Sequence, residues 1–164
     1  MSDITIRRAT ADDSRRLTRL VRGSRAYRGD YAAMVEGYQV GGPYIEHHPV
    51  FVAVDGGGDG DGGGSGKVLG FYALLVDGAG AGAGGEAELD LTFVADEAQG
   101  LGIGRLLMEH MVGQAGAAGV GSVKVVAHPP AEEFYLRTGA VRTGTVPPSG
   151  HVHWERPELR YDVA

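Results

Sequence analysis

The pattern of hydrophobic and polar residues predicts a chain that mixes strands and helices. Short apolar runs and alternating runs are typical of strands, and they occupy seven segments: residues 4–8, 50–54, 68–76, 87–94, 122–127, 139–145 and 151–162. Helical spacing predicts four helices: from Asp12 or Asp13, either of which can cap the first one, to about Gly23, and at residues 31–39, 105–118 and 131–138. The predicted order is therefore β-α-α-β-β-β-α-β-α-β-β.

The helical segments have apolar sides that we expect to be buried. In the first helix this side carries Leu17, Leu20 and Val21. In the helix at 105–118 the expected buried residues are Leu106, Leu107, Met111, Val112 and Ala115. The strand at 122–127 is mostly apolar and is interpreted as a buried strand covered on both faces.

Length and composition predict one globular domain spanning residues 1–164. The 164 residues are 43% hydrophobic and include no Cys, so neither a disulfide framework nor a thiolate metal site is expected. No apolar run approaches the ~18 residues of a membrane span, and residues 1–10 lack a signal-peptide pattern. We therefore expect a cytoplasmic protein with no membrane partner.

The net charge of −6 argues against nucleic acid as a partner. The charge is uneven, since residues 1–28 carry eight Arg against three Asp. Four of these arginines are interpreted as the solvated side of the first helix: Arg15, Arg16, Arg19 and Arg22.

Two glycine-rich stretches, residues 55–66 and 78–85, are interpreted as hairpin loops. The first resembles one imperfect copy of a calcium-binding repeat, which binds calcium only when several copies stack. His151 and His153 share a face of the predicted last strand, but no third ligand has informative spacing. The sequence therefore predicts no metal site.

A phosphate-binding turn is the strongest chemical signal. The segment Gln99-Gly100-Leu101-Gly102-Ile103-Gly104-Arg105 follows one predicted strand and opens a predicted helix. Backbone N–H groups at such a turn, together with the helix dipole, bind phosphate or pyrophosphate.

Three phosphate-binding patterns compete for this role. A Walker A loop fails around Gly66-Lys67, because position 61 is Asp and position 68 is Val. A dinucleotide fingerprint fails because its third glycine position holds Arg105 and no acid lies about 20 residues on. The third pattern, Q-x-x-G-x-G, is filled by Gln99, Gly102 and Gly104.

This third pattern resembles the coenzyme A pyrophosphate loop of the GCN5-related N-acetyltransferases (GNATs). A second segment, residues 131–140 (AEEFYLRTGA), resembles the later A-x-x-F-Y-x-x-x-G-F/A motif of the family, and its Tyr135 lies about 30 residues after the glycine turn. The resemblance extends over most of the chain. It implies a mixed α/β fold, with a mostly antiparallel sheet of about seven strands flanked by about four helices.

The resemblance also implies how a cofactor would be bound. The donor would be acetyl-coenzyme A, with its pantetheine arm where the sheet splays open after the strand at 87–94. A backbone N–H near Phe93 or Val94, at an expected bulge, would meet the oxyanion, and Gly102 and Gly104 would let the backbone approach the pyrophosphate. The implied cofactor-binding residues are Phe93, Val94, Gln99, Gly100, Leu101, Gly102, Ile103, Gly104, Arg105, His128 and Tyr135. His128 stands where many members carry Asn.

Two residues are candidates for proton transfer in the attack of an amine on a thioester. Glu88 lies 11 residues before Gln99, the spacing of a catalytic Glu in histone-acetylating members, and is the candidate base. Asp90 lies on the same face of a regular strand and is a tentative acceptor-binding residue, while Glu86 is expected in the preceding loop. Tyr135 is the candidate acid for the leaving thiolate, because a phenol is protonated at neutral pH.

The acceptor would be a primary amine of a small molecule or a protein, attacking directly in a ternary complex. Tyr31 is a tentative acceptor-binding residue, and Tyr27, Tyr38 and Trp154 are further aromatic candidates for the acceptor pocket. The alternative is a module that binds acyl-coenzyme A without catalysis, as a sensor. The sequence is also compatible with a homodimer.

Overall fold

The computed structural model describes residues 4–24, 38–56, 66–76, 85–150 and 152–163. Its strands are β1 (Ile4–Arg8), β2 (Val50–Asp55), β3 (Lys67–Leu75), β4 (Glu86–Val94), β5 (Ser122–Val126), β6 (Val141–Val146) and β7 (Arg156–Asp162). Its α-helices are α1 (Ser14–Arg22), α2 (Gly42–His47), α3 (Ile103–Ala117) and α4 (Glu132–Arg137). The mixed α/β class is confirmed, and every predicted strand and helix except the helix at 31–39 has a counterpart at its place in the order.

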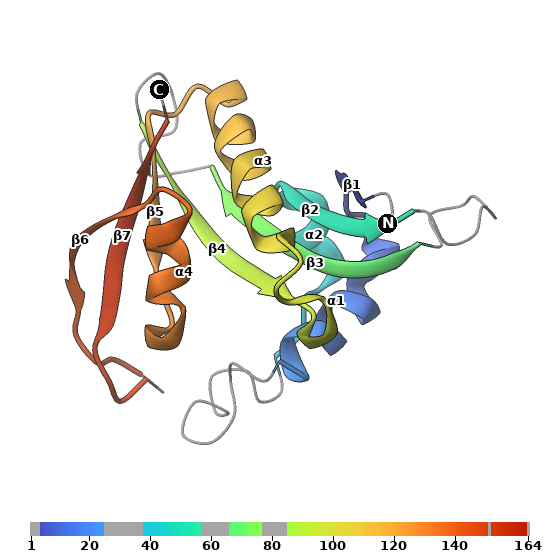
Figure 1. Cartoon of the computed structure of the whole chain (residues 1–164), viewed down its shortest axis with the longest axis horizontal. Coiled ribbons are helices and arrows are strands. Elements are labelled where there is room, and N and C mark those ends of the chain that lie inside the picture. The colour runs from blue at the N-terminus through green and yellow to red at the C-terminus, as the bar shows by residue number, and fades with distance from the viewer. Residues whose placement is uncertain (1–3, 25–37, 57–65, 77–84, 151, 164) are drawn as a thin grey trace.

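The seven strands form one sheet in the order β1-β2-β3-β4-β5-β7-β6. All neighbouring strands are antiparallel except β4 and β5, which are parallel because α3 carries the chain back between them. Helices α3 and α4 lie on one face of the sheet, whereas α1 and α2 lie on the other (Figure 1).

Two hydrophobic cores hold the helices to the sheet. Under α3 and α4 the buried cluster includes Tyr72, Leu107 and Met111, and under α1 and α2 it includes Leu17 and Phe71. Tyr72 and Phe71 are neighbours on β3, so alternation along one strand supplies both cores. No helix in the described part of the chain is long and apolar enough to cross a membrane.

The first helix begins differently from the prediction. Asp13 is the N-cap residue of α1, but its side chain makes no capping hydrogen bond there; a short 3-10 turn at Ala11–Asp13, capped by Thr10, leads into the helix. The Asp13 carboxylate is turned back to accept hydrogen bonds from the Arg7 guanidinium and from the Thr10 N–H, each at 2.9 Å. Asp13 is thus a buried tether between β1 and the helix.

The second predicted helix and α2 are different segments of the chain. The predicted helix at 31–39 lies largely outside the described residues, and residues 38–40 are not helical. The helix that the structure shows here is α2, which the sequence analysis missed because Gly41, Gly42 and Pro43 at its start indicate a turn.

The apolar side of α3 was only partly predicted. The buried residues are Ile103, Leu107, Met108, Met111 and Ala115, whereas Leu106 is 40% exposed. Because the helix begins at Ile103, its buried series repeats every four residues from there, and Leu106 is rotated about 100° from Leu107.

Among the strand boundaries that differ from the prediction, two concern candidate residues. Glu86 belongs to β4, because its backbone pairs with Ser122 of β5. The last strand begins at Arg156. His153 therefore precedes the strand instead of sharing a face of it, and His151 lies outside the described residues.

Candidate functional site

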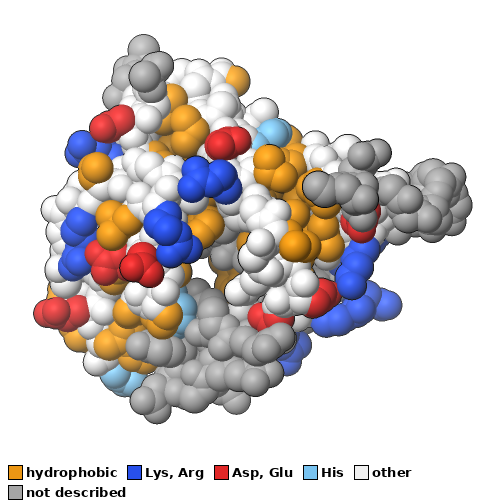
Figure 2. All heavy atoms as spheres, viewed as in Figure 1, with side chains coloured by type: hydrophobic (Ala, Val, Ile, Leu, Met, Phe, Trp, Pro, Cys, Tyr) orange, Lys and Arg blue, Asp and Glu red, His pale blue; other side chains and the backbone are white. Residues whose placement is uncertain are grey.

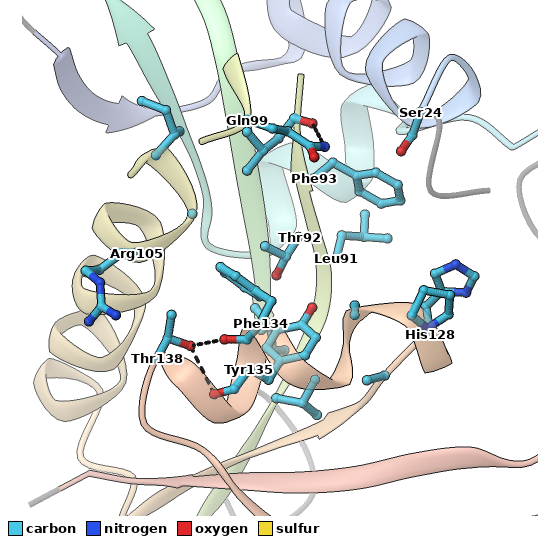
Figure 3. Close-up of a pocket in the computed structure, with 18 of the residues that line it drawn as sticks. Ser24, Leu91, Thr92, Phe93, Gln99, Arg105, His128, Phe134, Tyr135 and Thr138 are labelled. Atoms are coloured by element: carbon cyan, nitrogen blue, oxygen red, sulfur yellow. Dashed lines mark hydrogen bonds between the residues drawn. The ribbon is translucent and has the colours of Figure 1, made fainter. Parts of the chain in front are cut away.

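A cavity of about 600 Å³ opens between β4 and β5 and is bordered by α3 and α4. The space-filling view shows a hollow between the two halves of the molecule, with basic side chains near it (Figure 2). The glycine turn before α3 lines one end of the cavity, and Ser24 and His128 line another (Figure 3).

The register of β4 explains why the sheet opens here. β4 and β5 pair from Glu86 with Ser122 to Leu89 with Val125, and the rest of β4 continues without β5. On the other side, Leu89 and Leu91 pair with consecutive residues of β3, so Asp90 is skipped by the register. The extra residue forms a bulge, which bends a strand and increases its twist. The bulge therefore lies at Asp90 and not at Phe93 and Val94, which pair regularly with β3.

The glycine turn exposes the N-terminus of α3 to the cavity. Gly100 and Gly102 have φ of +86° and +82°, a backbone conformation that glycine adopts without a steric penalty. Gly102 is the N-cap of α3 and has no side-chain cap, and the first helical bond runs from the Leu106 N–H to its carbonyl. The N–H groups of the first turn are consequently available to an anion.

Gly104 also has a packing role that the sequence did not predict. A Cβ atom there would lie 2.6 Å from Cε1 and 2.9 Å from Cζ of Phe134, whereas a Cβ at Gly102 would meet nothing within 4 Å. The lack of a Cβ at Gly104 thus allows α3 to pack closely against Phe134 of α4. Gly102 instead allows the turn because it adopts a positive φ. Leu101, at the tip of the turn, is 68% exposed and does not line the cavity.

Two polar side chains of the turn form hydrogen bonds to neighbouring elements. The Gln99 Nε2 donates to the carbonyl of Val94 at 3.3 Å and closes the turn onto the end of β4. The Arg105 guanidinium donates to the carbonyl of Arg137 at 3.2 Å and joins α3 to the end of α4. Both residues line the cavity, and both position its walls.

Tyr135 points from α4 into the gap between β4 and β5 (Figure 3). It is 7% exposed, and burial raises the pKa of its phenol, which the neighbouring Thr92 hydroxyl lowers only in part. The two hydroxyls do not make a well-formed hydrogen bond, and Thr92 Oγ1 is buried without a partner among the described residues. Below Tyr135, Thr138 bonds to the Tyr161 hydroxyl at 2.7 Å and fixes α4 on β7.

The two candidate acids of β4, Glu88 and Asp90, occupy different positions. Asp90 lines the cavity, whereas Glu88 lies in the part of β4 that is paired with β5 and does not line it. The Tyr44 hydroxyl, from α2, donates to Asp90 Oδ2 at 2.5 Å. Burial and the charge of Asp90 raise the pKa of Tyr44, and Glu88 contributes from nearby, so Tyr44 remains a donor.

The sequence analysis missed Tyr44, because no motif contains it and α2 was not predicted. Tyr38 also lines the cavity, and burial and the charge of Asp90 raise its pKa. Tyr27 and Tyr31 lie outside the described residues, and Trp154 does not line the cavity.

Comparisons with known proteins agree with this architecture. The family model described as Acetyltransferase (GNAT) domain matches residues 46–139, which is more than half of the chain. The chain belongs to the GNAT acetyltransferase family.

Solved structures share the fold of this GNAT domain at low sequence identity. A protein assigned to the GNAT family from Desulfovibrio desulfuricans has a TM-score of 0.72 at 16% identity, covering 99% of this chain and 100% of that one. Ard1 from Thermoplasma volcanium has a TM-score of 0.69 at 18% identity, covering 98% of each chain. N-acetylglutamate synthase from Neisseria gonorrhoeae, complexed with coenzyme A and N-acetyl-glutamate, has a TM-score of 0.66 at 16% identity, covering 100% of this chain and 36% of that one. A search among curated proteins found no significant match.

In this GNAT acetyltransferase, the fold brings most of the motif residues to one cavity. The lining includes Phe93, Val94, Gln99, Gly100, Gly102, Ile103, Gly104, Arg105, His128 and Tyr135, together with Asp90. Leu101 and Glu88 stand outside it. Within the described residues, no group of three or more His, Asp or Glu side chains is arranged to hold a metal ion.

Proposed function

We propose that this GNAT protein transfers an acetyl group from acetyl-coenzyme A to a primary amine, by direct attack in a ternary complex. One observation carries the proposal: the gap between β4 and β5 leads from the uncapped N-terminus of α3, past Tyr135, to Asp90. An elongated cofactor with a pyrophosphate at one end and a reactive group at the other suits this arrangement.

The residues present fit coenzyme A. The N–H groups from Gly100 to Arg105 would hold the pyrophosphate, because the turn and the helix dipole both favour an anion. The unpartnered Thr92 hydroxyl in the gap offers a hydrogen bond to a polar group of the pantetheine arm. When bound, acetyl-coenzyme A supplies an activated acetyl thioester, and Phe93 or Val94 would offer a backbone N–H to its carbonyl oxygen.

Two acids of β4, Asp90 and Glu88, would bind and deprotonate the acceptor amine. An aliphatic ammonium has a pKa of about 10, so it must lose a proton before it can attack at neutral pH. Asp90, which Tyr44 orients toward the cavity, would bind the ammonium. Glu88, near Tyr44, would accept the proton, through water where it does not reach the amine directly.

Tyr135 would donate a proton to the thiolate that leaves. Its raised pKa keeps the phenol protonated across the neutral range, so the proton is present when the thiolate forms. A thiol has a pKa of about 8.5, below that of the phenol, so the transfer is uphill and the hydroxyl acts mainly as a strong donor to the developing charge.

The first test measures release of coenzyme A from acetyl-coenzyme A in the presence of a panel of primary amines. Amine-dependent release, together with thermal stabilisation by acetyl-coenzyme A, supports the proposal. Stabilisation without release on any amine would instead identify an acyl-coenzyme A sensor.

Variants then test the residue roles. We expect Asp90→Asn to raise KM for the amine, Glu88→Gln to shift the pH–rate profile, and Tyr135→Phe to lower kcat about 10- to 100-fold at saturating donor. Glu86→Gln is the matched control, because Glu86 is an exposed acid on the same strand and does not line the cavity. An unshifted profile for Glu88→Gln would remove Glu88 as the base.

A further inference from the structure

The cavity has a second end, away from the glycine turn, and its walls carry opposite charges. Ser24 and His128 lie at this end, on the far side of the site from Arg105 (Figure 3). Asp90 of β4 and Arg156 of β7 also line the cavity. In the proposed function this end receives the acceptor, because the glycine turn receives the cofactor.

The strand pairing places Arg156 beside the end of β5. β5 and β7 pair as far as Val126 with Glu158, and the Ala127 N–H then donates to the carbonyl of Pro157 at 2.9 Å. Arg156, the first residue of β7, therefore lies next to His128, opposite the β4 wall of the gap.

The guanidinium of Arg156 is incompletely satisfied by the protein. Its Nη2 donates to Ser149 Oγ at 3.3 Å and to the carbonyl of Pro147 at 3.5 Å, which are long contacts. Its Nε is buried and has no hydrogen-bond partner among the described residues. Arg142 and Arg160, on the same two-strand unit, are paired with Glu132 and Asp162.

Arg156 makes no such ion pair with a described carboxylate. A half-buried guanidinium without a counter-ion costs free energy unless an anion binds it. Its planar set of donors matches a carboxylate in geometry as well as in charge. The β7 wall is thus built to receive an anion, while Asp90, oriented by Tyr44, is built to receive a cation.

We infer that the acceptor is a free amino acid, whose ammonium is bound near Asp90 and whose carboxylate is bound by Arg156. This inference rests on the proposed function and narrows its acceptor class. An amine without a carboxylate would leave Arg156 unpaired, and an extended peptide would place an amide where the carboxylate belongs.

The test compares amino acids with the amines that remain when the carboxylate is removed. The pairs are L-phenylalanine with phenethylamine, L-leucine with isoamylamine, and L-ornithine with putrescine. For the preferred side chain we expect kcat/KM to be about 10- to 100-fold higher for the amino acid, the range of one charged hydrogen-bonded contact. Amines that match or exceed their amino acids in every pair would overturn the inference and leave the proposed function intact.

Variants assign the preference to the guanidinium. Arg156→Gln should raise KM for the amino acid about 10- to 100-fold and leave kcat/KM for the paired amine within about twofold. Arg156→Lys, which keeps the charge but loses the fork, should retain part of the preference. Arg160→Gln is the matched control on the same strand, since Arg160 pairs with Asp162 and does not line the cavity. Equal losses for both substrates in Arg156→Gln would contradict the assignment.

Binding tests the inference without turnover. With coenzyme A present, millimolar N-acetyl-L-phenylalanine, N-acetyl-L-leucine or N-acetyl-L-ornithine should raise the melting temperature, and Arg156→Gln should abolish that shift. Absence of any shift, or an equal shift with the N-acetyl amines, would overturn the inference even if no acetyl transfer were detected. Failure of transfer to every amine would count against the proposed function alone.

Discussion

The contact between Gly104 and Phe134 allows a sharp test of how α3 and α4 form the site. A Cβ atom at Gly104 would lie 2.6 Å from Phe134 Cε1, whereas carbon atoms in ordinary contact are ~3.5–4.0 Å apart. In Gly104→Ala the ring must therefore retreat by about 1 Å. The Phe134 ring packs edge-on against the Tyr135 ring, with 5.1 Å between their centroids, so a shift of Phe134 would also displace Tyr135, the candidate acid.

The magnitude follows from two opposing effects. Overpacking costs about 1–3 kcal/mol, while Ala in place of Gly in a helix returns up to about 1 kcal/mol. We expect a net loss of about 1–2 kcal/mol, which lowers the melting temperature of a protein of this size by about 2–8 °C. Displacement of a catalytic group by 1 Å lowers kcat by up to about 100-fold.

The same helix offers a control. Gly113 is exposed on α3, has no positive φ, and a Cβ there would meet nothing within 4 Å. Gly113→Ala should therefore raise the melting temperature by about 2–4 °C and leave kcat unchanged. Thermal unfolding and coenzyme A release are measured on both variants. Equal melting temperatures and equal kcat values for the two would refute the argument from the Phe134 contact.

Two further predictions concern the turn and the fold. Gly102→Ala must place an L-residue at φ of +82°, which costs about 1–2 kcal/mol. This variant should bind acetyl-coenzyme A more weakly in a titration, and an unchanged affinity would show that the turn conformation is not needed for binding. Asp13→Asn should destabilise the protein by about 2–3 kcal/mol at neutral pH. Burial alone would raise the pKa of Asp13, but hydrogen bonds from Arg7 and the Thr10 N–H outweigh it and hold the pKa below its ordinary value. The stabilisation by ionised Asp13 is therefore fully present above the unfolded pKa of about 4 and is lost as the pH falls through the folded pKa. The free energies of unfolding of wild type and Asp13→Asn, measured in denaturant, should therefore converge in acid. A difference between them that persists in acid would contradict a stabilisation by the ionised carboxylate.

Local patterns predicted most of the elements. The first strand was predicted with the bounds that the structure has, and the strand–turn–helix around Gln99 was predicted within two residues. These signals are local, since side-chain alternation and glycine spacing depend on neighbours along the chain. The prediction failed at α2, where Gly42 and Pro43 are equally typical of a turn and of a helix start.

The candidate site was predicted as two motifs, and only the fold shows how they meet. The glycine turn and the segment around Tyr135 line one cavity because β4 and β5 are parallel neighbours that separate after Leu89. The bulge at Asp90 depends on the register against β3, which no local pattern specifies. The same bulge distinguishes Asp90, which lines the cavity, from Glu88, which does not.

The sequence by itself determined the order of the elements apart from α2, the glycine turn before α3 and the family resemblance, because each depends on residues close together along the chain. The tertiary structure decided which residues share the site. Tyr44 reaches Asp90 from 46 positions away, and Arg156 lies beside the end of β5 through the pairing of β7. Such contacts arise from packing and strand register, and many sequence positions contribute to both at once. No short motif therefore predicts them.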